Sequence, residues 1–275
     1  MSSRKKRKKL KVTRNQKLIF SGLVLLILIL VIALVIVLVD NFLLEDFKVE
    51  SRIQNLKEEK KDDIPGFKHI GWIRVQGTNI DYPVVHAPDF DFSYITEDFT
   101  WTEVDFKKLN NITYVSGHNF LNLSSNPEIT DKSHRRFEQL MSFNYLDFVK
   151  DNQFIQYTVN GKEYVFKVYS VSYIEHSEID YYNEDKYSKS EVKDYVEETL
   201  ENSIFDFDID VNEDDMIISL DTCTRMYGDN TYMQFRVNGR LLRDGEKMKL
   251  SKVKKSSKYK EIEKLMKGGV SYEEA

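Results

Sequence analysis

Cys223 is the only cysteine of the 275-residue chain, so no intrachain disulfide can form. It lies three residues after the buried strand predicted at Met216–Leu220, and the residues beside it, from Asp221 to Arg225, are otherwise polar. A lone cysteine most often packs as a small apolar side chain. Reactive thiols, in contrast, are found in polar and partly solvated surroundings. We therefore interpret Cys223 as a candidate nucleophile.

His118 and Arg236 are two further candidates. His118 follows Gly117 in a Ser-Gly-His-Asn segment just after the apolar run 111–115, and loops at strand ends often carry catalytic groups. Arg236 lies inside the strand predicted at 232–242, where a charged side chain must face solvent or a polar site. Each of the two residues has an ordinary structural interpretation when it is taken alone.

Together the three residues form a coherent set for acyl transfer. A thiolate can attack an acyl carbon, an imidazole can protonate the leaving amine, and a guanidinium can stabilise the oxyanion or position the substrate. The spacing of 13 residues between Cys223 and Arg236 fits two adjacent antiparallel strands joined by a loop. Because the sequence has no H-x-x-x-H or C-x-x-C pairing, we expect no metal site.

Apolar alternation and turn signals predict a strand-rich domain to position these groups. We expect strands at 71–75, 79–85, 111–115, 154–159, 164–173, 216–220 and 232–242, and a helix at 137–148. Asn160-Gly161 is a hairpin signal, and Ser188–Glu191 is a capping box that opens a helix to about Leu200. Strands dominate without strict alternation with helices, which favours a mainly antiparallel β-barrel or sandwich with inserted helices.

The N-terminal part of the chain predicts a membrane anchor. Leu18–Val39 carries no charge and consists mostly of Leu, Ile and Val, and about 20 such residues span the ~30 Å hydrocarbon core. Residues 1–17 contain nine Lys or Arg and no acid, which places the N-terminus in the cytoplasm. No small-residue cleavage site follows, so we expect an uncleaved single-pass anchor with the rest of the chain outside the cell.

The remainder divides into three segments by composition. Residues 40–63 predict a polar helical stalk, residues 64–245 a catalytic domain, and residues 246–275 a polar, Lys-rich tail. The net charge is −5 although basic residues gather at the N-terminus, so the body of the chain is acidic. Because phosphate neutralisation dominates nucleic-acid binding, we expect no nucleic-acid partner.

Four segments resemble, in order, the landmarks of the sortase family. Residues 219–223 (Ser-Leu-Asp-Thr-Cys) are similar to its T-L-x-T-C signature, and 116–119 (Ser-Gly-His-Asn) to its Gly-His segment. Residues 235–241 resemble its Arg-bearing strand, and Gly-Trp-Ile at 71–73 with 80–85 resembles its early strands. The resemblance extends over about residues 64–243.

Two features make class B the most similar subclass. The capped helix at about 188–200, between the His and Cys strands, and a helical N-terminal extension both resemble class B sortases, which are cysteine transpeptidases of Gram-positive bacteria. A single N-terminal anchor argues against the class C pilin polymerases. The fold that the resemblance implies is the sortase barrel, with one transmembrane helix before it.

The resemblance also implies an activity. Cys223 is expected to attack the carbonyl after a Thr in a C-terminal sorting motif of secreted surface proteins, which forms a thioacyl intermediate. His118 is expected to act as acid and then as base, and Arg236 to hold the substrate and the oxyanion. An amine of a peptidoglycan precursor or of a pilin Lys then resolves the intermediate, and no cofactor is implied.

Thr222, Asp221 and Asn119 are predicted to bind substrate. Asp221 departs from the resemblance most, because a carboxylate two residues before the nucleophile tends to raise the pKa of the thiol. Contact with substrate is the alternative role for Asp221, and the sequence leaves both open.

Two other functions fit part of the pattern. A cysteine hydrolase of the same fold would use the same Cys and His with water in place of the amine. An inactive sortase-like module would only bind surface proteins, although the presence of Cys223, His118 and Arg236 together argues against it.

Overall fold

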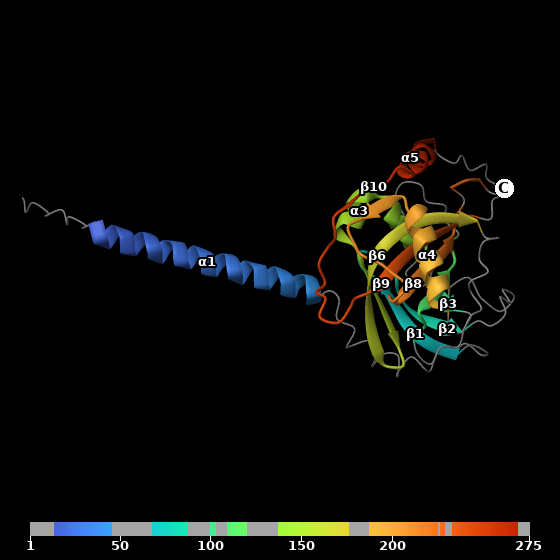
Figure 1. Cartoon of the computed structure of the whole chain (residues 1–275), viewed down its shortest axis with the longest axis horizontal. Coiled ribbons are helices and arrows are strands. Elements are labelled where there is room, and N and C mark those ends of the chain that lie inside the picture. Colours follow the sequence, from blue (N-terminus) through green and yellow to red (C-terminus); the bar gives the residue numbers. More distant parts are fainter. Residues whose placement is uncertain are drawn as a thin grey trace, which may run out of the picture. The chain divides into compact units, whose positions relative to one another are not determined.

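The computed structural model describes residues 14–45, 68–86, 100–102, 109–119, 137–175, 187–224, 226–228 and 233–268. The chain divides into two units, Met1–Lys48 and Val49–Ala275. The first unit contains helix α1 (Arg14–Glu45), and the second contains the described strands (Figure 1). The predicted segments 1–17, 40–63 and 246–275 lie partly outside the described residues, and the predicted segment boundaries stay predictions.

Helix α1 covers the predicted membrane anchor at Leu18–Val39. A helix needs about 20 consecutive apolar residues to cross the ~30 Å hydrocarbon core. Among the residues that the structure describes, no helix is sufficiently long and apolar to span a membrane. The predicted localisation, a single-pass membrane protein with a cytoplasmic N-terminus and an extracellular catalytic domain, is therefore wrong. The transmembrane helix of the predicted fold class is likewise not supported.

Eight strands of the second unit form a closed barrel in the order β1-β2-β3-β4-β8-β9-β6-β5. Two neighbouring pairs, β2–β3 and β4–β8, are parallel, and the other pairs are antiparallel. The mainly β barrel with helices that the sequence predicts is thus confirmed. The strands are β1 (Lys68–Val75), β2 (Asp81–His86), β3 (Thr100–Thr102), β4 (Ile112–Gly117), β5 (Phe154–Val159), β6 (Lys162–Glu175), β8 (Ile217–Cys223) and β9 (Met233–Leu241).

The β5–β6 hairpin follows directly from its turn residues. Asn160 and Gly161 have φ values of 50° and 71°, which a type I′ turn requires at both central positions. The turn fixes the register, so that Val159 pairs with Lys162 and Phe154 with Lys167. Strand β5 begins and ends where the alternation of the sequence predicts.

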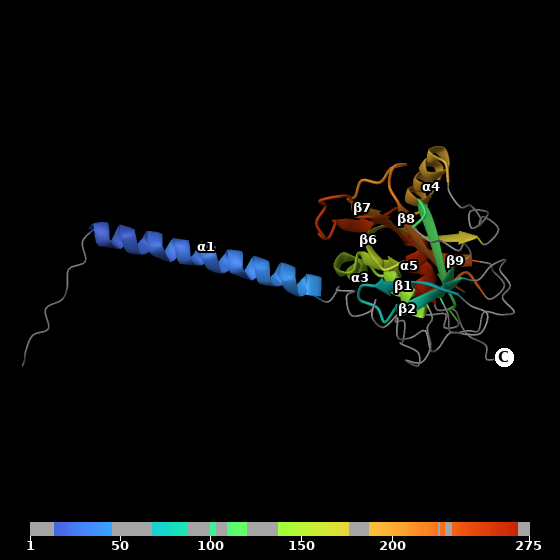
Figure 2. The same cartoon turned by 90° about the horizontal axis from the view of Figure 1, so that it is seen from below.

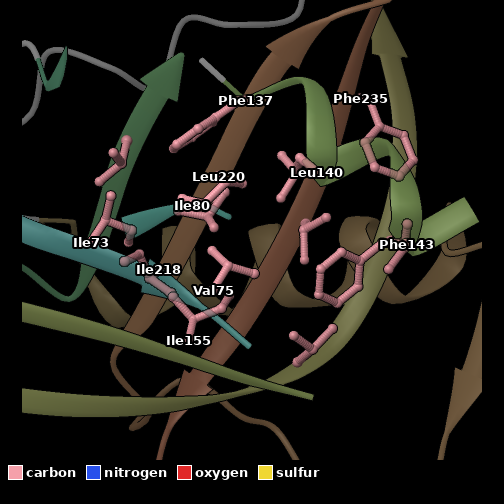
Figure 3. Packing of buried hydrophobic residues seen from close by; sticks show 14 of the residues in the cluster. Ile73, Val75, Ile80, Phe137, Leu140, Phe143, Ile155, Ile218, Leu220 and Phe235 are labelled. Atoms are coloured by element: carbon pink, nitrogen blue, oxygen red, sulfur yellow. The ribbon is translucent and has the colours of Figure 1, made fainter. Parts of the chain in front are cut away.

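Apolar side chains from the strands fill the barrel. Ile73 of β1, Leu220 of β8 and Phe235 of β9 are fully buried and belong to one cluster with Phe137, which precedes the first inserted helix. Figure 3 shows these side chains pointing into the space that the strands enclose. Burial of each such side chain contributes about 1.5–3 kcal/mol, so the interior of the barrel holds β8 and β9 firmly in place.

Helix α4 (Lys189–Glu201) covers part of the outer face of the barrel, near β6 and β8 in both Figures 1 and 2. Its predicted capping box is present: the Ser188 hydroxyl accepts from the Glu191 N–H, and the Glu191 carboxylate accepts from the Ser188 N–H. Val192 and Tyr195 of α4 pack in a second apolar cluster, with Ile217 of β8. Residues on this outer face of β8 are therefore buried as well.

The remaining elements lie around residues 138–151 and 205–268. The helix predicted at 137–148 is divided by the extended residue Tyr145 into the 3-10 helix η3 (Glu138–Asn144) and α3 (Leu146–Asp151). Two short strands, β7 (Phe205–Phe207) and β10 (Val253–Lys255), form a separate antiparallel pair. Helix α5 (Tyr259–Gly268) follows and buries the side chains of Tyr259 and Ile262.

Candidate functional site

The ends of two adjacent parallel strands bring the predicted nucleophile and the predicted acid–base residue to one edge of the barrel. Strands β4 and β8 pair in parallel from Ile112 and Ile217 to Ser116 and Asp221. Because the strands run in the same direction, the residues that follow this last pair also lie side by side. His118 comes two residues after Ser116, and Cys223 two residues after Asp221.

Side-chain hydrogen bonds fasten the two strand ends together. The Thr222 hydroxyl donates to the Gly117 carbonyl at 2.7 Å, and the Asn119 carboxamide Nδ2 donates to the Cys223 carbonyl at 3.1 Å. One bond lies immediately before His118 and the other immediately after it. The backbone on both sides of the imidazole is thus tied to the backbone that carries the thiol.

Gly117 is required by the close approach of an aromatic ring. A Cβ at this position would lie 2.6 Å from the Phe137 ring, a distance that real Cβ atoms essentially never show. The Phe137 N–H also donates to the His118 carbonyl at 2.9 Å. The glycine that the sequence places before His118 therefore lets Phe137 support the loop from the interior of the barrel.

The thiol and the imidazole are more exposed to solvent than the neighbouring side chain of Thr222. Cys223 is exposed and its thiol forms no disulfide, while His118 is half-buried. The hydroxyl-bearing residue Thr222 is buried and its hydroxyl is bonded to backbone. An exposed thiol beside a half-buried imidazole is an arrangement in which a substrate carbonyl can reach the sulfur and a proton can move to the leaving group.

Asp221 and Arg236 form a buried ion pair, two residue pairs before Cys223 in the β8–β9 register. Arg236 Nε donates to Asp221 Oδ1 at 2.7 Å and Nη2 to Oδ2 at 3.2 Å, with side-chain exposures of 3% and 1%. The guanidinium also lies over the rings of Tyr114 and Tyr195, at 5.5 and 5.9 Å from their centroids. A desolvated cation–π contact contributes about 2 kcal/mol, so aromatic rings and carboxylate hold Arg236 together.

Tyr114 and Tyr195 stay neutral in this setting. Burial raises the pKa of Tyr195 to about 12, and burial together with Tyr195 raises the pKa of Tyr114 well above its usual value. The neighbouring Arg236 opposes both shifts but does not outweigh burial. Asp221 is therefore the anionic partner of Arg236 in this cluster, and its charge is offset by the guanidinium.

The structure brings Cys223, His118, Asn119 and Thr222 to one edge and places Arg236 deeper in the barrel wall. Strands β8 and β9 are adjacent and antiparallel, as the spacing of Cys223 and Arg236 predicts. Their register pairs Arg236 with Asp221, however, while the residue opposite Cys223 is Gln234. The spacing of the two residues predicted that their strands are adjacent, but it did not predict this register.

The ion pair was not foreseen, although the sequence contains a signal for it. Asp221 and Arg236 are opposite charges in two strand segments that are rich in apolar residues, and the two segments flank one loop. Opposite charges in two such strands favour mutual pairing over solvent exposure, because an unpaired buried charge is costly. Arg225, which also follows the nucleophile, lies outside the described residues. In the part of the chain that is described, no group of three or more His, Cys, Asp or Glu residues is arranged to hold a metal.

Comparisons with known proteins agree with this geometry. No protein-family model matches the chain. Sortase B of Staphylococcus aureus is 24% identical over 194 residues, which cover 66% of this chain and 72% of that protein. The crystal structure of Clostridium perfringens sortase B matches with a TM-score of 0.54 and 25% identity, over 68% of this chain and all of that one.

A sortase B crystallised in complex with triglycine matches with a TM-score of 0.53 and 20% identity, over 74% of this chain and 92% of that one, and shows a common fold. The predicted resemblance to class B sortases is confirmed by these similarities in sequence and in fold. They indicate that the chain is an enzyme, a cysteine transpeptidase of the sortase type.

Proposed function

We propose that this chain cleaves a C-terminal sorting motif of secreted proteins and transfers the acyl part to an amine, with Cys223 as nucleophile and His118 as acid and base. The observation that carries the proposal is the joint end of β4 and β8. There the exposed thiol and the half-buried imidazole follow paired strands, and Asn119 and Thr222 fasten the two backbones.

The reaction has two halves. The Cys223 thiolate attacks the substrate carbonyl, a C–S bond forms, and the tetrahedral intermediate collapses with cleavage of the C–N bond. His118 gives its proton to the leaving amine. An incoming amine then attacks the thioacyl carbon and gives a proton to His118, and cleavage of the C–S bond returns the thiolate.

The acceptor in the second half is an amine of a peptidoglycan precursor or of a pilin Lys. The complex of a sortase B with triglycine supports an acceptor with an unhindered primary amine. The exposed position of Cys223 supports the same conclusion, since a second substrate must reach the thioacyl group after the first has left. The sorting motif itself is a peptide whose carbonyl follows a Thr, as the similarity to sortases suggests.

We assign Arg236 a supporting role in this reaction. Its Nε and Nη2 donors are bonded to Asp221, and its side chain is buried and lies over the rings of two tyrosines. From this position it fixes Asp221, two residues before the nucleophile, and so holds the end of β8 in place. Asp221 and Thr222, which the sequence suggests as substrate contacts, serve the same purpose from within the wall.

The test is a peptide assay on the full chain. We would incubate it with fluorogenic sorting-motif peptides, with and without triglycine, beside Cys223→Ala. The proposal expects cleavage that needs Cys223 and an amide product when triglycine is present. Release of only the free acid at high triglycine would show a hydrolase instead, and the absence of any Cys223 adduct across the panel would contradict the proposal.

A further inference from the structure

The strand register places a neutral side chain, not an arginine, beside the nucleophile. In the β8–β9 pairing Cys223 lies directly opposite Gln234, and Asp221 lies opposite Arg236. Directly opposed residues of antiparallel strands have Cβ atoms about 4.5–5.5 Å apart and project from the same face. We propose that the Gln234 carboxamide donates to the acyl oxygen at Cys223 and stabilises the oxyanion of the tetrahedral intermediate; this inference rests on the proposed function.

The alternation of the two strands identifies the face on which Gln234 lies. Leu220 and Phe235 are fully buried in the cluster that fills the barrel. Successive side chains of a strand point to opposite faces, so Gln234 and Cys223 both belong to the outer face. Arg236 and Asp221 share this face but lie two residues further from the strand ends.

Exposure separates Gln234 from Arg236. Gln234 is half-buried, as expected of a side chain that meets a substrate, and Cys223 opposite it is exposed. Arg236 is 2% exposed, and two residues of strand place its Cα about 7 Å from that of Gln234. Two of the N–H donors of the guanidinium are already bonded to Asp221.

A carboxamide is a suitable group for stabilising the oxyanion. Side-chain amides serve as oxyanion donors in acyl transfer, and removal of one such donor lowers kcat by about 10²–10³-fold. The carboxamide also has an acceptor oxygen, which can take a hydrogen bond from a peptide N–H of the sorting motif. Because the group is neutral, it stabilises developing negative charge without adding a net charge beside the thiol.

The test compares variants of two neighbouring residues on β9. Gln234→Ala in the full chain is expected to lower the rate of thioacyl formation at Cys223 about 100-fold with little change in KM. Gln234→Glu is expected to be at least as slow, since a carboxylate repels the oxyanion, and Gln234→Arg, which keeps N–H donors, to retain more activity than either. Met233→Ala, adjacent on the strand but on the other face, serves as the control and is expected to stay within about threefold of the wild type.

Intact mass of the acylated enzyme separates the possible failures. If the wild-type chain forms no Cys223 adduct with any peptide, the proposed function fails. If the wild type is acylated and Gln234→Ala keeps its rate and its melting temperature, only the role of Gln234 is overturned. A rate lost together with the melting temperature in Gln234→Ala but recovered in Gln234→Glu would also overturn it, because a packing role would then explain the loss.

Discussion

Strand β9 carries two buried arginines, one near its middle and one near its C-terminal end, and the two have different surroundings. Arg236 pairs with Asp221 of the adjacent strand, in contact with the rings of two tyrosines and close to the edge with Cys223 and His118. Arg240 bonds Glu246 on the following loop at 2.6 and 2.8 Å, and that carboxylate is 28% exposed. The same residue type in the same strand therefore forms a fully buried ion pair close to the catalytic edge and a partly exposed ion pair with a loop further along the strand.

The difference shows what a buried arginine in a strand contributes. Each guanidinium pairs with a carboxylate, and neither pair by itself constitutes a catalytic site. Function is assigned to one end because an exposed thiol and an imidazole lie there, at the paired ends of β4 and β8. The ion pairs organise the backbone around such groups, and changes to each end should separate activity from stability.

The largest loss of activity without a loss of stability is expected from His118→Ala, at the Cys223 end. Loss of the acid–base group should lower the transfer rate by about 10²–10⁴-fold, because the leaving amine then departs without a proton donor. The half-buried imidazole adds little packing, so the melting temperature should stay close to that of the wild type. Turnover of a sorting-motif peptide and thermal unfolding measure the two quantities; an active His118→Ala would remove the distinction between the two ends.

The buried pair itself is expected to affect stability most. Arg236→Met leaves Asp221 buried without its partner and should lower the free energy of unfolding by about 3–5 kcal/mol. The double variant Asp221→Leu/Arg236→Met should recover most of that loss, since apolar replacements of a buried pair are often neutral. Denaturant unfolding measures both, and a double variant as unstable as the single one would show that the pair has a further structural role.

The Arg240–Glu246 pair is expected to make part of the free energy of unfolding depend on pH. Arg240, by hydrogen bonding, lowers the pKa of Glu246 to about 2 against burial, which raises it. A carboxylate whose pKa is lowered on folding contributes stability above its unfolded pKa of about 4.3, and this contribution is lost as the pH falls towards 2.

Glu246→Gln should therefore weaken the pH dependence of the melting temperature between about pH 4.5 and 2, while peptide turnover at neutral pH stays unchanged. Thermal unfolding across this range measures the effect. An equally steep curve in the variant would assign the acid sensitivity to other carboxylates, and a loss of turnover would link the two ends of β9.

The smallest effect on stability is expected from Asn119→Ala. The variant loses one hydrogen bond, from Asn119 Nδ2 to the Cys223 carbonyl, which contributes about 0.5–1.5 kcal/mol. Because that bond fastens the His118 loop to the nucleophile, turnover should fall more than stability does, by about tenfold. Peptide kinetics beside denaturant unfolding test this, and a fall in stability alone would make Asn119 a structural residue only.

Local signals in the sequence predicted much of the barrel. The Asn160-Gly161 turn, the Ser188 capping box and the alternation of 154–159 each depend on residues close in sequence, and the structure contains all three. The adjacency of β8 and β9 also followed from the short loop between them.

What the sequence did not predict depends on pairing between distant segments. Strand β3 is three residues long and has too few positions for a periodic pattern. The parallel pairing of β4 with β8 joins segments about 100 residues apart, and it is this pairing that places His118 beside Cys223. The Asp221–Arg236 bond depends on a register that only the packed barrel determines.

The most direct test of the central claim is the intact mass of the full chain after reaction with a sorting-motif peptide, before and after addition of triglycine. The account predicts a thioacyl adduct on Cys223 that is absent in Cys223→Ala, disappears when triglycine is added, and yields a peptide–triglycine amide. An adduct on another residue, or the same product from Cys223→Ala, would contradict the assignment of the β4–β8 edge as the catalytic site.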